Sequence, residues 1–243
     1  MQAAALLAFF RRLDVLAFLL CVALFLAFPD IDRHISALFF DPQQGFHLKD
    51  HPLIIGIYKA TGWLMGSLLI GLMLLFAASF LPRLRPRLPR RRTLGFLICA
   101  ALLGPGLLVN ATFKENWKRP RPAQTVDFGG QYQFSPALTP GDECRRCLSF
   151  VSGHASVGFW LFAFALLSCR RRWLCLPILA GLIIGGVRIL QGGHYLGDVL
   201  FSGWVVWFST YLLYRLFYGH APFAREARQP DPHQAQPAPA LLD

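Results

Sequence analysis

Long apolar runs bounded by charged residues dominate the chain. Residues 60–81 and 93–113 contain no charged residue at all. Six apolar segments can be distinguished, at residues 12–29, 60–81, 93–113, 150–169, 173–188 and 196–217. A bilayer offers no hydrogen-bond partners for the backbone, so such segments cross it as helices and not as open strands. The pattern predicts an all-α, polytopic membrane protein with six transmembrane helices.

The composition agrees with this pattern. Of 243 residues, 55% are hydrophobic and only 15% are charged, which is too apolar for a soluble, disordered or disulfide-dense secreted protein. The length suits one transmembrane domain over residues 1–220. Residues 221–243 contain five prolines and few hydrophobic residues. We expect a disordered cytoplasmic tail there.

The excess of positive charge has an explanation that does not involve nucleic acid. The chain carries 24 Lys and Arg against 13 Asp and Glu, a formal net charge of +11. Arginines cluster beside alternate span ends, at positions 11–12, 83–92, 170–172 and 215–228. Positively charged loops stay on the cytoplasmic side. The distribution therefore predicts that both termini are cytoplasmic.

The first apolar segment resembles a signal peptide because two arginines precede it. No small-x-small cleavage site follows, so we interpret it as a retained anchor. Residues 30–59 are expected to form a non-cytoplasmic loop with an interfacial helix. In the third segment, Pro105 predicts a kink and Asn110 a hydrogen bond to another helix.

Two of the six cysteines differ from the rest. Cys144 and Cys147 lie in the loop 114–149, which the topology places in an oxidising compartment. We predict a local disulfide there, with free thiols as the alternative. The other four are expected to be free, apolar packing residues.

Polar residues gather at span ends on the face opposite the arginine-rich loops. Ends of odd-numbered spans and starts of even-numbered spans share one membrane face, so residues distant in sequence meet in one layer. Three pieces of this layer have distinctive spacing: Lys114-x6-Arg121-Pro122, Ser152-Gly153-His154 and Arg188-x5-His194-x3-Asp198. The spacing predicts one polar site built from three parts of the chain.

Several of these residues are suited to binding phosphate. Lys114, Arg121 and Arg188 form a predicted anion cradle of three cations, and the guanidinium groups of the two arginines match phosphate oxygens in bidentate geometry. Ser152 and Gly153 add a hydroxyl and an unhindered N–H at a helix start, where the helix dipole favours negative charge. Lys118, Arg119, Arg145 and Arg146, in contrast, are interpreted as solvated loop charges or contacts to lipid headgroups.

The remaining residues are suited to transferring phosphate. His194 and Asp198 are four positions apart, so we expect them on one helix face, where the carboxylate fixes the imidazole tautomer. His154 supplies a second titrating group. One histidine can then attack phosphorus while the other protonates the leaving oxygen.

Taken in order, the three pieces resemble the signature of the type 2 phosphatidic acid phosphatase superfamily, which also contains bacterial acid phosphatases and vanadium haloperoxidases. The resemblance covers about residues 94–217, the last four spans, and implies a four-helix catalytic core. It implies that His194 is the nucleophile that forms a phosphohistidine, that Asp198 orients it, and that His154 is the leaving-group acid. It implies no metal and no cofactor.

The same resemblance implies that the cations at positions 114, 121 and 188, with Ser152 and Gly153, bind the phosphate and its transition-state charge. Two positions depart from the usual pattern. Val151 replaces the usual proline of the second motif, and Val187 replaces the usual serine before the arginine of the third. Neither departure removes a cationic or titrating group.

The sequence therefore predicts a membrane phosphatase of the inner membrane that faces the periplasm. Its expected substrate is a lipid phosphomonoester or diphosphate: lipid A, undecaprenyl diphosphate, phosphatidylglycerophosphate or phosphatidic acid. The overall layout is most similar to bacterial lipid A phosphatases. A lipid phosphotransferase using the same site is the nearest alternative, and a haloperoxidase or a non-catalytic lipid transporter ranks lower. The oligomeric state is left open.

Overall fold

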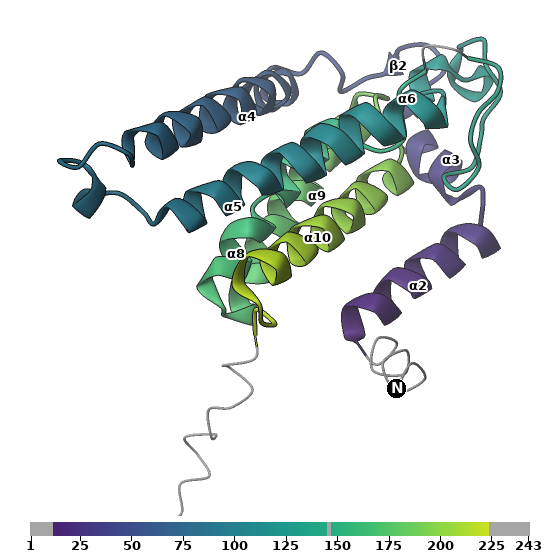
Figure 1. Cartoon of the computed structure of the whole chain (residues 1–243). Helices are drawn as coiled ribbons and strands as arrows, with labels where there is room; N and C mark the ends of the chain where they lie inside the picture. The colour runs from purple at the N-terminus through teal and green to yellow at the C-terminus, as the bar shows by residue number, and fades with distance from the viewer. Residues whose placement is uncertain (1–11, 145–146, 224–243) are drawn as a thin grey trace, which may run out of the picture.

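The protein is described here by a computed structural model covering residues 12–144 and 147–223 (Figure 1). The described part is mainly helical. Its elements are α2 Leu13–Ala27, α3 Ile31–Ala37, β1 Phe40–Asp41, β2 Gly45–Phe46, α4 Pro52–Ala78, η1 Arg85–Arg87, α5 Arg91–Ala101, η2 Leu102–Phe113, α6 Lys114–Trp117, η3 Pro122–Gln124, η4 Val126–Phe128, α7 Gly153–Phe159, α8 Phe162–Ser168, η5 Arg171–Leu174, α9 Cys175–Leu190 and α10 Leu196–Tyr218.

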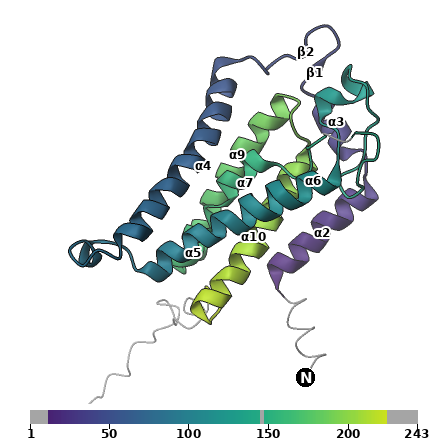
Figure 2. The same cartoon turned by 45° about the horizontal axis from the view of Figure 1, so that its top comes forward.

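The long helices form one bundle around α10. Helices α5, α7, α8 and α9 and the segment η2 all pack against α10, and α7 also packs closely on α9. Buried Phe96, Trp160, Leu166 and Val206 form part of the core. Helix α4 lies on the outside of the bundle, and the β1–β2 hairpin, α3 and α6 gather at the end opposite the α4–α5 connection (Figures 1 and 2).

Four helices of the described residues are long and apolar enough to cross a membrane: Pro52–Ala78, Arg91–Gln124, Arg171–Leu190 and Leu196–Tyr218. A fifth span results if α2 and α3, which meet at 80°, are counted as one bent unit. The apolar stretch Gly153–Ser168 is shorter. The structure thus gives four or five spans by length and composition, where the sequence predicted six.

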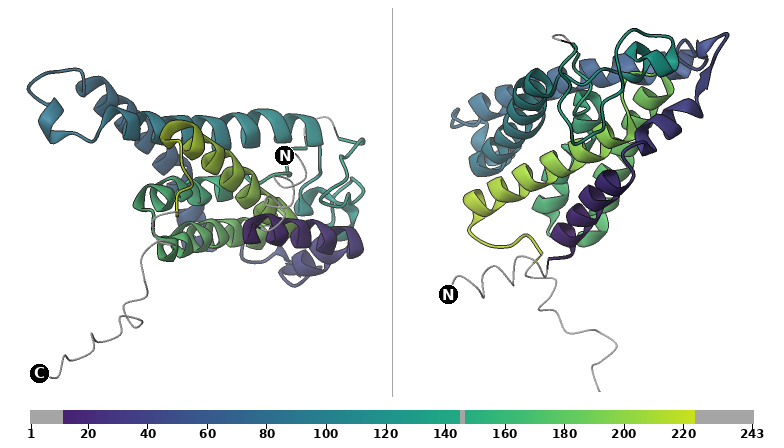
Figure 3. Two further views of the ribbon diagram at one scale, coloured as in Figure 1. Left: turned by 60° about the horizontal axis from the view of Figure 1, so that its bottom comes forward. Right: turned by 90° about the vertical axis from the view of Figure 1, so that its right-hand side faces the viewer.

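The first predicted span, residues 12–29, is shorter than expected. Helix α2 has 15 residues, and Phe28 leaves the helical conformation with φ −126° and ψ 70°. Phe28 precedes Pro29, whose ring disfavours the helical region for its neighbour. The chain then turns into α3, so the predicted interfacial segment lies against the bundle beside the start of α10 (Figure 3).

The second span begins earlier than the sequence indicated. Helix α4 begins at Pro52, eight residues before the predicted start at 60, and it includes Lys59. Proline suits the first helical turn because its φ is already helical and its missing N–H is not needed there. Lys59 is exposed, and a lysine can extend its charge to the interface from within an apolar helix.

The third span continues past its predicted end at 113 as far as Trp117, through the π-helical segment η2. Pro105 lies inside η2. The Asn110 side chain donates to the Pro105 carbonyl at 2.7 Å, within its own helix. The expected hydrogen bond to another helix was therefore wrong, because both ends of the Asn110 amide bond within the same helical segment, to the Pro105 carbonyl and to Lys114 Nζ.

The fourth span, predicted at 150–169, begins at Gly153 and is divided into α7 and α8. Of the predicted tail 221–243, all but residues 221–223 lies outside the described residues, as do Arg11, Arg145 and Arg146.

Candidate active site

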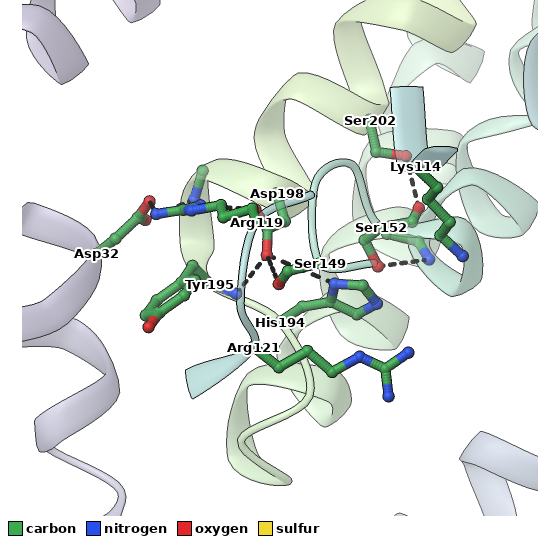
Figure 4. Close-up of polar contacts among 12 residues, drawn as sticks. Asp32, Lys114, Arg119, Arg121, Ser149, Ser152, His194, Tyr195, Asp198 and Ser202 are labelled. Atoms are coloured by element: carbon green, nitrogen blue, oxygen red, sulfur yellow. Dashed lines mark hydrogen bonds and ion pairs between the residues drawn. The ribbon is translucent and has the colours of Figure 1, made fainter. Parts of the chain in front are cut away.

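The three motif pieces converge where η2 and α6 end, α7 begins and α9 is followed by α10. Figure 4 shows the His194 imidazole with its outer edge between the Lys114 amine and the Arg121 guanidinium. His154 lies within electrostatic range of these two cations, of Arg188 and of His194. The structure thus brings together residues from all three pieces, in one polar site at one end of the bundle.

A tight turn after α9 places His194. The carbonyl of Arg188 accepts from the N–H groups of Gly193 at 2.9 Å and His194 at 3.3 Å. Gly192, with φ +64°, supplies the left-handed conformation that this turn needs. His194 therefore precedes α10 and is not on it, which corrects the expectation that it shares a helix face with Asp198.

Asp198 meets His194 because it is the third residue of α10 and reaches back over the helix start. Its Oδ2 accepts from the backbone N–H of Tyr195 at 2.8 Å and lies 3.5 Å from His194 Nδ1. Ser149, which the sequence reasoning missed, donates its hydroxyl to the same oxygen at 2.5 Å. The carboxylate is fully buried and held from several directions. It can therefore orient the imidazole with little freedom.

Arg119 is a correction to the sequence interpretation. It was interpreted as a solvated or headgroup-contacting charge, but its side chain is 0% exposed. Lys118 ends α6 in a left-handed conformation with φ 51°, and Arg119 follows it into the interior. Its guanidinium donates to Asp198 Oδ1 at 2.6 Å and to Asp32 Oδ2 at 2.8 Å. These oxygens replace the water that a loop arginine would have.

Burial decides the protonation of His194. Its pKa is lowered from 6.5 to about 4, chiefly by desolvation and also by the positive charges of Arg188 and Lys114. Asp198 opposes this shift without reversing it. Near pH 7 His194 is therefore neutral, the form in which an imidazole nitrogen can act as a nucleophile.

The cationic side chains have spare donors. Arg188 is 8% exposed, and its Nε is buried without a hydrogen-bond partner. Its Nη1 donates to the Gln191 side chain. Lys114 donates to Asn110 Oδ1 at 2.8 Å, which leaves two of its three ammonium protons for another acceptor. An anion with several oxygens could satisfy these donors together.

Ser152 and Gly153 occupy the start of α7. The Ser152 hydroxyl accepts from Ala155 N at 3.4 Å as the helix cap, and the Ser152 carbonyl accepts from Ser202 Oγ at 2.8 Å. A Cβ at Gly153 would lie 2.6 Å from Lys114 Nζ. A side chain at this position would therefore displace the lysine amine from the first turn of α7.

Tyr58 is a site residue that the sequence reasoning did not find. It lies on α4, and its ring stacks on the His154 imidazole at a centroid distance of 4.7 Å. The Arg188 guanidinium carbon lies 4.5 Å from the centre of the same ring. A tyrosine in an apolar helix carries no motif, so nothing in the sequence pointed to it.

The loop before α7 contains a disulfide between Cys144 and Cys147. Cys21, Cys99, Cys169 and Cys175 are free. Within residues 12–144 and 147–223, no group of three or more His, Cys, Asp and Glu side chains is placed to hold a metal ion.

Comparison with known proteins identifies the family of the chain. Residues 93–221 match the PAP2 superfamily. The chain is 32% identical over 200 residues to a lipid A 4'-phosphatase of Francisella tularensis subsp. novicida, covering 80% of this chain and 89% of that protein. It is 33% identical over 206 residues to a lipid A 4'-phosphatase of Rhizobium etli, covering 76% of this chain and 77% of the relative. No solved structure matches.

The fold and the site define a membrane phosphatase, a hydrolase of phosphoric esters. The chain belongs to the PAP2 superfamily, whose match spans just over half of its length and includes all three motif pieces.

Proposed function

We propose that this phosphatase removes a phosphate group from a lipid of the lipid A type, through a phosphohistidine on His194. The observation that carries the proposal is the position of the His194 ring. One edge faces Asp198, and the other edge faces the space between two cations (Figure 4). The names of the similar proteins favour lipid A over the other lipid phosphates.

In the first step the Nε2 lone pair of neutral His194 attacks phosphorus while the bond to the lipid oxygen breaks. Asp198 faces the Nδ1 side and stabilises the positive charge that develops on the ring. The negative charge of the bound phosphate offsets the surrounding cations and favours the protonated form of His154, which gives this proton to the departing oxygen; the lipid leaves with a hydroxyl group. The products of this step are the dephosphorylated lipid and a phosphohistidine.

In the second step water attacks the phosphohistidine. His154, now neutral, accepts a proton from the water, and the P–N bond breaks to release inorganic phosphate and restore His194. Lys114, Arg121 and Arg188 bind the phosphoryl oxygens in both steps. Ser152 and the Gly153 N–H complete the cradle at the start of α7.

We further propose a six-span topology with cytoplasmic termini, in which the PAP2 core is preceded by two additional spans and followed by a cytoplasmic tail from residue 221. The site then faces the periplasm from the inner membrane. Between Arg172 and Arg188 in the fifth span lie only 15 residues, about 22 Å of helix, so Arg188 falls short of the far surface of a hydrocarbon core of roughly 30 Å. The phosphate site then lies at or just below the membrane surface, where a lipid headgroup can enter while its chains stay in the bilayer.

The test is inorganic phosphate release by detergent-purified protein in EDTA. The panel contains lipid A, undecaprenyl diphosphate, phosphatidylglycerophosphate and phosphatidic acid. Phosphate release from lipid A should exceed release from the other three lipids, and it should be absent in the His194→Ala protein. His220→Ala is a matched control, because His220 is exposed and follows the far end of α10 from His194. Retained activity in His194→Ala would refute the phosphohistidine.

A second set of reactions separates hydrolysis from phosphotransfer. The same lipid A is incubated with and without a second lipid as acceptor, and both free phosphate and acceptor phosphate are measured. Hydrolysis predicts phosphate release that does not need the acceptor. Transfer that occurs only with the acceptor would establish the phosphotransferase instead.

A further inference from the structure

The N-terminal segment contributes a buried carboxylate to the active site. Asp32 lies in α3, outside the residues that match the PAP2 superfamily, and is 0% exposed. Its Oδ2 accepts from Arg119 at 2.8 Å, and its Oδ1 accepts from the backbone N–H of Gly197 at 2.7 Å. Gly197 directly precedes Asp198. Asp32 is thus bonded both to the helix start that carries Asp198 and to the arginine that pairs with it.

Packing of α2 and α3 against α10 fixes this carboxylate in place. The rings of Phe25 and Phe201 meet edge to face at 5.4 Å, and Trp207 donates to Asp14 at 2.8 Å. A Cβ at Gly197 would lie 2.8 Å from Asp32 Oδ2 and 2.9 Å from the Phe25 ring. Only glycine at this position allows the two segments to approach so closely.

The charges of the network explain what Asp32 can do. Arg119 is a single buried cation between two buried carboxylates, Asp32 and Asp198. If Asp32 were neutral, Asp198 alone would balance the Arg119 charge. Less of its negative potential would then be available to His194, which becomes positive when it attacks phosphorus. With Asp32 charged, the three-residue network keeps one net negative charge beside the imidazole.

We propose that Asp32 is a positioning residue for phosphate transfer: through Arg119 it holds Asp198 in place and preserves the negative charge that supports His194. The proposal rests on the phosphohistidine mechanism proposed above. It makes the α2–α3 segment part of the catalytic apparatus, although this segment lies outside the matched superfamily region.

Asp32→Asn is the main variant, because it removes the charge and keeps the shape and the acceptor for Gly197. Loss of one charge-assisted hydrogen bond in such a network should lower kcat about tenfold or more. KM should change less than about twofold, because the phosphate-binding side chains of Lys114, Arg121 and Arg188 are untouched. Asp30→Asn is the matched control, since Asp30 pairs with Arg33 at the surface two residues away.

A merely structural role must be separated from a positioning role. Calorimetric titration with inorganic phosphate gives the number of intact sites per protein molecule. In the Asp32→Asn protein we expect the wild-type stoichiometry and Kd together with the lower kcat. A stoichiometry that falls in proportion to kcat would mean that Asp32 only maintains the fold, and would overturn the proposal.

Arg119→Lys provides a second variant in case Asp32→Asn does not fold. Lysine keeps the charge but lacks the fork that reaches both carboxylates. The kcat of Arg119→Lys should fall about as far as that of Asp32→Asn, because both variants break the bridge. The double variant should lose less than about twofold more than either single one. Full additivity would show that Asp32 does not act through Arg119.

p-Nitrophenyl phosphate, a small phosphomonoester, is assayed in parallel with lipid A. If the wild-type protein hydrolyses only the small ester, the proposed lipid substrate is wrong, but the role of Asp32 can still be tested with the small ester. If the wild type hydrolyses either substrate and Asp32→Asn has wild-type kcat, the positioning role alone fails. A wild-type protein inactive on both overturns both proposals.

Discussion

The ring of Tyr58 stacks on the imidazole of His154, with planes 29° apart, although α4 lies on the outside of the bundle. The guanidinium group of Arg188 lies over the same ring in a cation–π contact. One aromatic side chain from outside the PAP2 match thus restrains the proposed leaving-group acid and one of the phosphate-binding cations. Helix α4 is therefore part of the site wall and not only a membrane anchor.

Replacing Tyr58 should impair catalysis only when the substitution removes the aromatic ring. Tyr58→Ala removes both ring contacts, each worth about 1 kcal/mol, so kcat/KM should fall roughly thirtyfold. Tyr58→Phe keeps the ring and should stay within about twofold of wild type. Phosphate release under steady-state conditions measures both. Trp63→Ala, on the same helix and 80% exposed, is the control. A Tyr58→Phe protein as impaired as Tyr58→Ala would show that the hydroxyl, and not the ring, matters.

Ser149 should matter for the rate and not for substrate binding. Ser149→Ala removes the hydroxyl that donates to Asp198 Oδ2, leaving this oxygen freer to move away from His194. Hydrogen bonds to charged groups contribute about 1.5–3 kcal/mol, so kcat should fall about tenfold or more with KM nearly unchanged. Ser168→Ala, at the exposed end of α8, should have no effect. An increased KM with unchanged kcat would place Ser149 in phosphate binding instead.

The residues that carry out the chemistry could be predicted from the sequence, whereas the residues that position them could not. The spacing of the three motif pieces indicated His154, His194 and Asp198, because these residues lie close to helix ends that share one face. Asp32 could not be found in this way. It lies 87 positions from Arg119 in a short helix, and only the packing of α3 against α10 brings the two together.

The limits of the spans were predicted less well for a similar reason. Hydropathy locates apolar segments, but local geometry decides where each helix begins and ends. Pro29 ends α2 early, and Pro52 begins α4 early. Arg119 was misinterpreted because one basic residue among several in a loop carries no sign of burial. Its burial depends on two carboxylates that are distant in sequence.

Acid should destabilise the protein partly through His194. Its folded-state pKa of about 4 lies below the unfolded value of 6.5, so the unfolded state binds more protons between these two values. The stability that depends on a neutral His194 is present above pH 6.5 and is lost as the pH falls toward 4. His194→Gln removes this contribution. Its Tm, followed by thermal unfolding in detergent, should decline less steeply than that of wild type between pH 6.5 and about 4. Parallel curves would contradict the low pKa.

The proposed topology can be tested with Cys175, the one exposed free cysteine among the described residues. It starts α9, immediately after η5 and the arginines at 170–172, and the other end of α9 leads to the phosphate site. With Cys21, Cys99 and Cys169 replaced by alanine, Cys175 is the free thiol left to react, because the disulfide-bonded pair does not.

A membrane-impermeant maleimide should therefore label Cys175 in inverted inner-membrane vesicles and not in intact spheroplasts. A variant without Cys175 that carries Gln131→Cys, in the exposed loop beside the site, should give the opposite result. If Cys175 is labelled in spheroplasts and the thiol introduced by Gln131→Cys is not, the proposed orientation is wrong and the phosphate site faces the cytoplasm. Because α9 is a single uninterrupted helix, these two thiols on opposite sides of it determine which leaflet supplies the substrate.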